Sequence, residues 1–137
     1  MISKFFIVLL FFILSCSVSK TEKMKDICAT EMIGKTFKNV SFKELKNTPE
    51  NFIDTIIEIT GVLHFNFEDV ALYMNKTSYR DNALWLELNK EMAKHAEELT
   101  KFNGKKVKVL GIFVLEKKGH LNSYYASLFN VSCIKVQ

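Results

Sequence analysis

Few residues in this 137-residue chain have the type and spacing that chemistry requires. The three histidines, His64, His95 and His120, stand far apart in the sequence. Metal ligands usually come at tight spacing, so a site built from His64, Asp69 and His120 would need two distant loops to meet. Unrelated surface positions explain these residues more simply. We therefore predict no metal site and no cofactor, and keep His64 and His120 as speculative binding residues.

The motifs that mark common enzyme classes are absent from the sequence. It contains no phosphate-binding glycine loop, no Cys-x-x-Cys, no His-Glu-x-x-His and no Gly-x-Ser-x-Gly. The carboxylate pairs Glu68-Asp69 and Glu97-Glu98 are typical of a solvated turn and a helix surface. Since no nucleophile, base or metal cluster can be assigned, we predict no catalytic residue and do not expect an enzyme.

Cys16 follows a ten-residue apolar run, Phe5 to Leu14, that Lys4 precedes. The run is too short for a membrane span, which needs roughly 20 residues, and it has the length and the positive lead of a secretory signal. A buried core helix is the alternative, but a segment without any polar face fits so small a core poorly.

The end of this run, Ile13-Leu14-Ser15-Cys16, resembles a bacterial lipobox. The resemblance implies that Cys16 is diacylated on its sulfur, that the chain is cut after Ser15, and that the new amino terminus is acylated. Acyl chains would then hold the protein at a bilayer. An ordinary signal with a chance cysteine is the alternative.

The two other cysteines, Cys28 and Cys133, form an even pair. In an oxidising envelope such a pair is often bridged, and a bond here would close a long loop. Cys133 shares its parity with Phe129 and Val131, so a buried free thiol is the alternative.

The elements that must position these residues are mostly strands. Alternation of apolar and polar residues predicts strands at 57–67, 70–74, 83–89, 105–116 and 125–136. The spacing of Met92, Ala96 and Leu99 predicts one main helix within 90–104, capped by Asn89 and ended by Gly104. Gly61 and Gly111 fall in mid-strand, where they indicate bends or bulges.

This order, three strands, one helix and two strands, resembles the OB-fold, a five-stranded Greek-key barrel with its helix between the third and fourth strands. The resemblance covers about 55–136 and rests on element order, on Gly61 and on the run FNGKKVKVLGIF. The fold prediction is therefore mainly β with one main helix and an OB-fold-like barrel. An open antiparallel α+β sheet is the alternative.

With its lipobox and its charged tether, the chain is also similar to small OB-type lipoproteins of bacterial envelopes. The passage Ala71 to Leu88 carries this likeness. The group brings no catalytic motif with it. The implied location is the bacterial cell envelope, anchored to a membrane, with the outer membrane facing the periplasm or the cell surface favoured.

Tyr73 and Trp85 are the candidate binding aromatics. If the leucines of the strand at 83–89 point inward, Trp85 points outward, and Tyr73 does the same on the preceding strand. OB-folds use that face for ligands. Alternatively, residues 29–46 cover both rings. In that case the loops at 66–69 and 117–124 become the better place to look for a site.

The chain divides into three segments that differ in their charge. We predict a signal peptide at 1–15, a lipidated tether and pre-barrel segment at 16–46, and an OB-like domain at 47–137. Between residues 20 and 46 seven lysines meet four acids, whereas from residue 47 eleven basic residues meet eleven acidic ones. The lysine surplus therefore lies beside the membrane, and the neutral domain argues against nucleic acid as a partner.

These observations predict a membrane-anchored, non-catalytic module that binds an envelope protein or peptide. A small-ligand or glycan binder that uses the Tyr73 and Trp85 face is the main alternative. An immunity or inhibitor protein is a further one.

Overall fold

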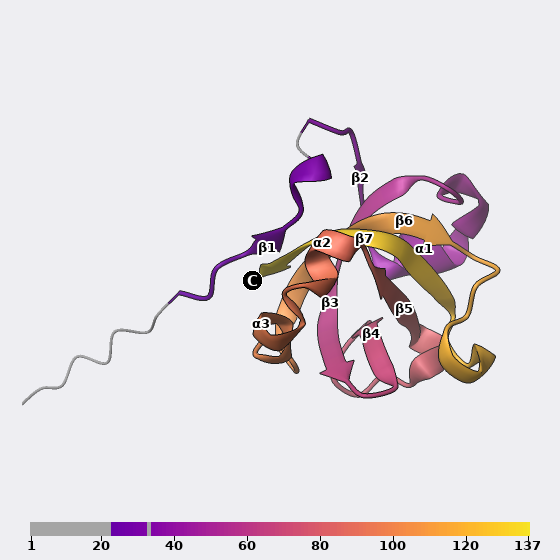
Figure 1. The fold of residues 1–137 in the computed structure, drawn as a ribbon. Helices are drawn as coiled ribbons and strands as arrows, with labels where there is room; N and C mark the ends of the chain where they lie inside the picture. The colour runs from indigo at the N-terminus through magenta and orange to yellow at the C-terminus, as the bar shows by residue number, and fades with distance from the viewer. Residues whose placement is uncertain (1–22, 33) are drawn as a thin grey trace, which may run out of the picture.

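The computed structural model describes residues 23–32 and 34–137. The predicted signal peptide and Cys16 lie outside the described residues. The fold as a whole is shown in Figure 1.

Within the described chain the structure is mainly β, with short helices and helical turns. The strands are β1 (Ile27–Cys28), β2 (Lys38–Val40), β3 (Ile56–Asn66), β4 (Asp69–Tyr73), β5 (Ala83–Leu88), β6 (Lys106–Val114) and β7 (Ala126–Val136). The α-helices are α1 (Phe42–Asn47), α2 (Lys90–Ala93) and α3 (Ala96–Thr100). The 3-10 turns are η1 (Thr30–Met32), η2 (Pro49–Asn51), η3 (Arg80–Asn82) and η4 (His120–Asn122).

Five of these strands close into a barrel. β3 pairs antiparallel with β4, and β4 pairs antiparallel with β5. β5 then runs parallel to β7, and β6 pairs antiparallel with both β7 and β3. With α2 and α3 between the third and fourth barrel strands, this is an OB-fold-like barrel. The predicted fold is confirmed, and the open-sheet alternative is wrong because β6 joins the two ends of the sheet.

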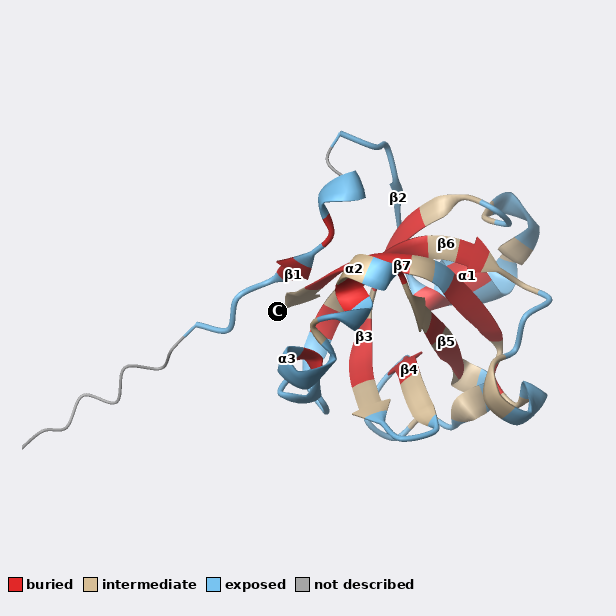
Figure 2. Ribbon diagram, in the orientation of Figure 1, coloured by how far each residue is buried: buried red, intermediate tan, exposed pale blue. Residues whose placement is uncertain are grey.

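The barrel interior is filled by alternate strand residues, as the period of a β-strand requires. The largest fully buried side chains include Phe113, Ile57, Leu63, Leu72 and Leu128. Figure 2 shows the barrel strands largely buried and the turns between them exposed.

Gly61 lies where β3 changes partner. Residues 56–62 of β3 pair with β6, and residues 62–66 pair with β4. A Cβ atom at Gly61 would lie 2.5 Å from the Tyr73 carbonyl oxygen and 2.8 Å from Leu72 Cγ. Because only hydrogen fits there, glycine lets the backbone of β4 approach the bend in β3.

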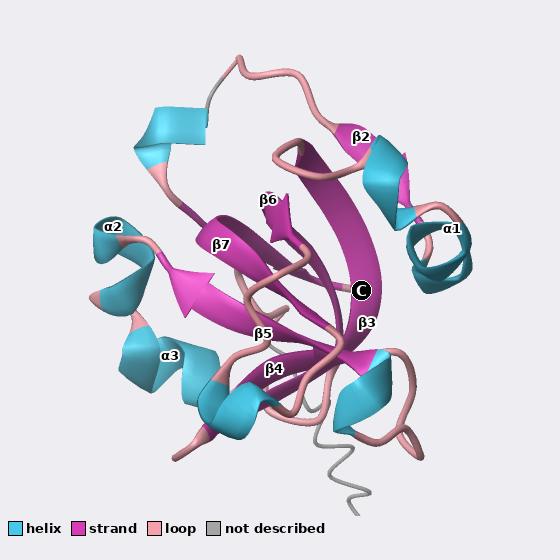
Figure 3. Ribbon diagram, turned by 90° about the vertical axis from the view of Figure 1, so that its right-hand side faces the viewer, coloured by secondary structure: helices cyan, strands magenta, loops and turns pink. Residues whose placement is uncertain are grey.

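The segment before the barrel packs into the same core. Ile27, Ala29, Val40, Phe42 and Leu45 are all buried in it. Ser41 and Glu44 form a reciprocal capping box at the start of α1. Figure 3 shows α1 on one side of the barrel and α2 with α3 on the other.

β1 and β2 extend the sheet on either side of the barrel. β2 runs parallel to β3, and β1 runs antiparallel to β7. In the β1–β7 register Cys28 lies opposite Cys133, and their sulfur atoms are bonded across a sequence separation of 105 residues.

The predicted single helix at 90–104 is wrong, because the structure divides it into α2 and α3. Asn89 caps α2, and its side chain accepts a hydrogen bond from the Met92 N–H at 2.8 Å. The end of α2 tightens into 3-10 hydrogen bonds, such as that from His95 N to Met92 O, and the α-helix stops there. Met92 and Leu99 are buried as predicted, whereas Ala96 is exposed.

The strand predicted at 57–67 ends one residue early, so Phe67 does not continue its alternation. β3 ends at Asn66, and Glu68 has a φ of 62°, so the strand alternation stops before it reaches Phe67. Phe67 therefore stands on the turn between β3 and β4, where it is 93% exposed.

Candidate functional site

Polar and aromatic side chains gather where the β3–β4 turn meets the loop between β6 and β7. We call Asp69, His64, Tyr73 and Tyr124 the Asp69 cluster. His64 comes from β3, Asp69 and Tyr73 lie at the two ends of β4, and Tyr124 lies near the end of the β6–β7 loop. Register pairs in the β3–β4 hairpin place His64 opposite Ala71 and Val62 opposite Tyr73. The cluster therefore lies on the outer side of the barrel.

Asp69 accepts hydrogen bonds from three side chains. Tyr73 Oη donates to Asp69 Oδ1 at 2.9 Å, and Tyr124 Oη donates to the same oxygen at 2.5 Å. His64 Nδ1 lies 3.0 Å from Asp69 Oδ2, and the His64 ring stacks on Tyr73 with centroids 3.9 Å apart. Each of the three donors therefore meets the carboxylate at hydrogen-bond distance.

These contacts shift the pKa values of the cluster in opposite directions. Partial burial of Asp69 raises its pKa, but hydrogen bonds from Tyr124, His64 and Tyr73 outweigh burial and lower the pKa of the carboxyl below its usual range. Burial, with the hydrogen bond to Asp69 second, raises the pKa of both Tyr73 and Tyr124. Both tyrosines therefore remain donors and Asp69 remains an acceptor at neutral pH.

The β6–β7 loop is folded tightly by its own backbone. Tyr124 N donates to Lys118 O at 3.0 Å, and Ser127 Oγ donates to Lys117 O at 2.6 Å. Gly119 has a φ of 63°, and a Cβ atom there would overlap the Trp85 side chain. The loop is thus pressed directly onto the outer side of β5.

The predicted outward position of Tyr73 and Trp85 agrees with this arrangement, but neither ring is open. Tyr73 is 5% exposed and Trp85 is half-buried. Trp85 packs beside Tyr124, with ring centroids 5.3 Å apart. In the described structure the β6–β7 loop covers both rings, whereas the described part of residues 29–46 contributes Ala29, Val40, Phe42 and Leu45 to the main core.

His64 and His120 both lie where the β3–β4 turn meets the β6–β7 loop, and each contacts a different carboxylate. His120 Nε2 is 3.9 Å from Glu68 Oε2, whereas His64 contacts Asp69. Over residues 23–32 and 34–137, no group of three or more histidine, cysteine, aspartate or glutamate side chains is arranged to hold a metal ion. His95 lies apart from the cluster, beside Glu98 in α3.

Three exposed side chains with large apolar groups stand on the loops that adjoin the Asp69 cluster. Phe67 is on the β3–β4 turn, Leu121 is in η4 of the β6–β7 loop, and Tyr79 precedes η3. Leu121 and Tyr79 are 78% and 81% exposed. Arg80 joins η3 to the loop, because its Nη1 donates to Ser123 Oγ at 3.3 Å. We call Phe67, Tyr79 and Leu121 the loop rim.

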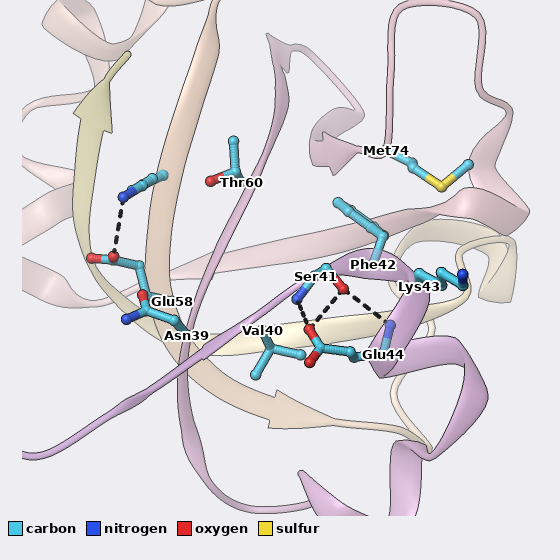
Figure 4. Close-up of a pocket in the computed structure, with 10 residues that line it drawn as sticks. Asn39, Val40, Ser41, Phe42, Lys43, Glu44, Glu58, Thr60 and Met74 are labelled. Carbon is cyan, nitrogen blue, oxygen red and sulfur yellow. Dashed lines mark hydrogen bonds and ion pairs between the residues drawn. The ribbon is translucent and has the colours of Figure 1, made fainter.

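Apart from the Asp69 cluster, the structure has a surface hollow of about 610 Å³ between β3 and the segment that leads into α1. Glu58 on β3 is its buried acid, and Lys135 Nζ and Lys108 Nζ lie 3.3 and 3.8 Å from the Glu58 carboxylate. Figure 4 shows Glu58 and Thr60 facing this hollow from β3, across from the capping box of Ser41 and Glu44. Two pairs of its lining residues interact, Ser41 with Glu44 and Lys108 with Glu58.

Sequence reasoning named the loops at 66–69 and 117–124 only as an alternative site, and it missed both the contact between Asp69 and Tyr124 and the burial of Glu58. The Asp69–Tyr124 contact joins residues 55 positions apart, and no periodic pattern marks it. Glu58 has the parity of a solvent-facing residue, and that parity is correct. Lys108 and Lys135 pair with its carboxylate, and Asn39 lies opposite it on β2.

The fold and the cluster define an OB-like β-barrel protein in which a loop closes over the outer side of β4 and β5. No protein-family model matches the chain, and a search of curated proteins also finds no match. None of the helices in the described residues has both the length and the apolar character needed to cross a membrane.

Proposed function

We propose that this protein is a lipid-anchored protein of the bacterial cell envelope, attached at Cys16, whose barrel binds a protein or peptide partner without catalysis. The lipobox-like sequence supports the anchor. The loop rim supports the partner. Large apolar side chains held outside the core are typical of protein-binding surfaces.

The single observation that carries the binding function is the fixed geometry beneath the loop rim. Phe67 and Leu121 are each one residue from the Glu68–His120 contact, so both stand on loops that touch. The Asp69–Tyr124 hydrogen bond ties the same two loops. Rings and aliphatic groups presented on ordered loops lose little conformational entropy on binding, which favours recognition of a protein surface.

The glycan alternative has less support. Stacking on a sugar needs an open aromatic face, but the Tyr73 ring is stacked on His64 and the Trp85 ring is half-buried under the β6–β7 loop. An immunity or inhibitor protein would be a special case of protein binding, and the same rim would serve it.

Site-specific photo-crosslinking in the producing cells tests the binding function. Benzoylphenylalanine placed at Phe67 or Leu121 should yield a discrete adduct with one partner. The same probe at Glu97, which is exposed on α3, is the control and should yield none. A partner captured equally from Glu97, or no adduct from either rim position, would contradict the proposal.

A further inference from the structure

The chain that precedes β2 is attached to the barrel mainly at β1. We call residues 23–32 and 34–37 the N-terminal arm. Among the arm residues whose exposure the structure describes, only Ile27 and Ala29 are buried, with 6% and 2% of their surface exposed. Figure 1 shows β1 as the place where this part of the chain meets β7. The position of the arm therefore depends on the contacts around β1.

Apart from the disulfide, few contacts hold the arm in this place. The β1–β7 ladder has two residue pairs, and one further hydrogen bond extends it, from Ala29 N to Ser132 O at 2.6 Å. Thr30 contacts α2, where its N–H and its hydroxyl each donate to the Glu91 carboxylate at 3.0 Å. Those two bonds are exposed, and exposed hydrogen bonds contribute little because water competes for both partners.

The disulfide is not needed to close the barrel. β7 pairs with β6 from Ser127 to Val136 and with β5 from Ala126 to Val131. The bond instead joins the arm to this strand, because one of its cysteines belongs to β1 and the other to β7. In the folded protein its effect therefore falls on the arm.

The two cysteines of the bond differ in access. Cys28 is exposed, whereas Cys133 is 4% exposed. Thiol–disulfide exchange begins when a thiolate attacks a sulfur atom that it can reach, and exposed disulfides are the ones most open to reduction. A reductant would therefore attack the sulfur of Cys28.

We propose that Cys28–Cys133 is a redox-controlled clamp that holds the N-terminal arm on β7 and releases it when a dithiol reduces the bond. One thiolate of the dithiol attacks Cys28 Sγ, so a mixed disulfide forms there and Cys133 leaves as a thiolate. The second thiolate then attacks the reagent sulfur of the mixed disulfide and frees Cys28. The dithiol supplies two electrons and becomes a disulfide, and the protons of its two thiols pass to the two cysteines.

Release follows from reduction because the remaining contacts of the arm are few. The burial of Ile27 and Ala29 then has to offset the conformational entropy lost in ordering the whole arm. The chain beyond the arm stays in place, since Val40, Phe42 and Leu45 are buried in the main core. Reduction therefore opens the arm locally and leaves the barrel closed.

Release would change how far the barrel can move from a membrane, a consequence that rests on the proposed lipid anchor at Cys16. With the bond intact, the twelve residues from the anchor to Cys28 span at most roughly 40 Å when fully extended. After release the free chain runs to Lys38, the first residue of β2, and its twenty-two residues span at most roughly 75 Å. The loop rim could then meet a partner farther from the bilayer.

Hydrogen exchange of the full chain, followed by mass spectrometry, tests the clamp. The amides of Ala29 and Thr30 are hydrogen-bonded, so peptides that cover 27–32 should be protected in the oxidised protein. After treatment with dithiothreitol, a dithiol, these peptides should exchange about tenfold faster or more, while peptides from β3 and β6 stay protected. Cys28→Ala/Cys133→Ala is the matched control and should exchange fast with or without dithiothreitol.

Two results of this experiment would overturn the clamp. Protection of 27–32 that survives reduction would mean that the other contacts hold the arm without the bond. Equal losses of protection in the arm and in β3 and β6 would mean that the bond stabilises the whole barrel rather than the arm.

Energy transfer from Trp85, the only tryptophan, to dansyl phosphatidylethanolamine tests the tether length. With the lipidated full chain in vesicles, dithiothreitol should lower the transfer in the wild type and leave it unchanged in Cys28→Ala/Cys133→Ala. Undiminished transfer in the reduced wild type would contradict a longer tether. Intact mass reports the acyl chains separately. A chain without them would contradict the lipid anchor, and hydrogen exchange would still decide whether the clamp exists.

Discussion

Asp69 is the residue that ties two loops of this barrel together, through Tyr73 on its own strand and Tyr124 across the structure. Replacing Asp69 with asparagine removes the charge that these donors satisfy. We expect Asp69→Asn to lower the free energy of unfolding at pH 7 by about 1–2 kcal/mol, a low value for hydrogen bonds to a charged group because the carboxylate is partly solvated.

The pH dependence of this loss has a definite sign. The folded-state pKa of Asp69 is below its ordinary value, so its stabilisation is present above about pH 4 and is lost as the pH falls through the folded-state pKa. In urea unfolding between pH 7 and pH 3, the gap between wild type and Asp69→Asn should narrow with acid. A gap that stays constant would show that the charge of Asp69 contributes nothing.

Gly119 is the second residue on which the closed loop depends. Gly119→Ala should destabilise the protein by at least about 2 kcal/mol, because the new Cβ meets Trp85 and the φ is positive. Gly104→Ala is the control, since Gly104 has a φ of 76° and a Cβ atom added there would have no neighbour within 4 Å. It should cost about 1 kcal/mol.

Thermal unfolding and the emission of Trp85 measure the effect. Trp85 should become more solvated in Gly119→Ala and stay unchanged in Gly104→Ala. Equal losses of stability in the two variants, with unchanged emission, would mean that the loop does not press on Trp85.

At the scale of elements, the bond between β1 and β7 stands out because the β1 ladder has only two residues. Reduction of Cys28–Cys133 should lower the free energy of unfolding by about 2–4 kcal/mol, since it frees a long loop in the unfolded chain. Urea unfolding with and without reductant measures this. A Cys28→Ala/Cys133→Ala variant is the control and should not respond to reductant.

Intact mass under denaturing conditions checks the same bond directly. The unreduced chain should carry no alkylatable thiol at Cys28 or Cys133. Two free thiols there would contradict the bridge.

The elements could be predicted where they follow a period. Strand alternation placed β3 to β7 in order, Asn89 marked the start of α2, and Gly61 marked the bend in β3. These signals are local, and the barrel follows from them because its strands are arranged by short connections and one helical crossover.

The candidate site could be predicted only in part, because its contacts are not local. Parity correctly placed Trp85 outside the barrel, but nothing in the sequence showed that Gly119 and Tyr124 would fold over it. The break between α2 and α3 was likewise hidden, since Met92 and Leu99 fit one helical face. Tertiary packing determines both the loop over Trp85 and the break between α2 and α3, and the periodicity of a sequence carries no information on such packing.

At the scale of the whole molecule, the proposed envelope function depends on a lipid anchor at Cys16. Metabolic labelling with a fatty-acid probe should mark the wild-type protein and leave Cys16→Ala unlabelled. The variant should also be released from the membrane fraction, because two or more acyl chains are needed for stable anchoring. A Cys16→Ala protein that stays labelled and membrane-bound would mean that the apolar segment is an uncleaved anchor.

The disulfide at Cys28 also determines how the domain would bear mechanical load. A pull on the N-terminal segment, with a partner held at the loop rim, would put tension on the chain at Cys28. A two-residue ladder would peel apart under such tension. The covalent link to Cys133 instead passes the force to β7, which is hydrogen-bonded to β5 on one side and to β6 on the other. The force would therefore act on β7, and β7 could leave the barrel only if its hydrogen bonds to both β5 and β6 broke together.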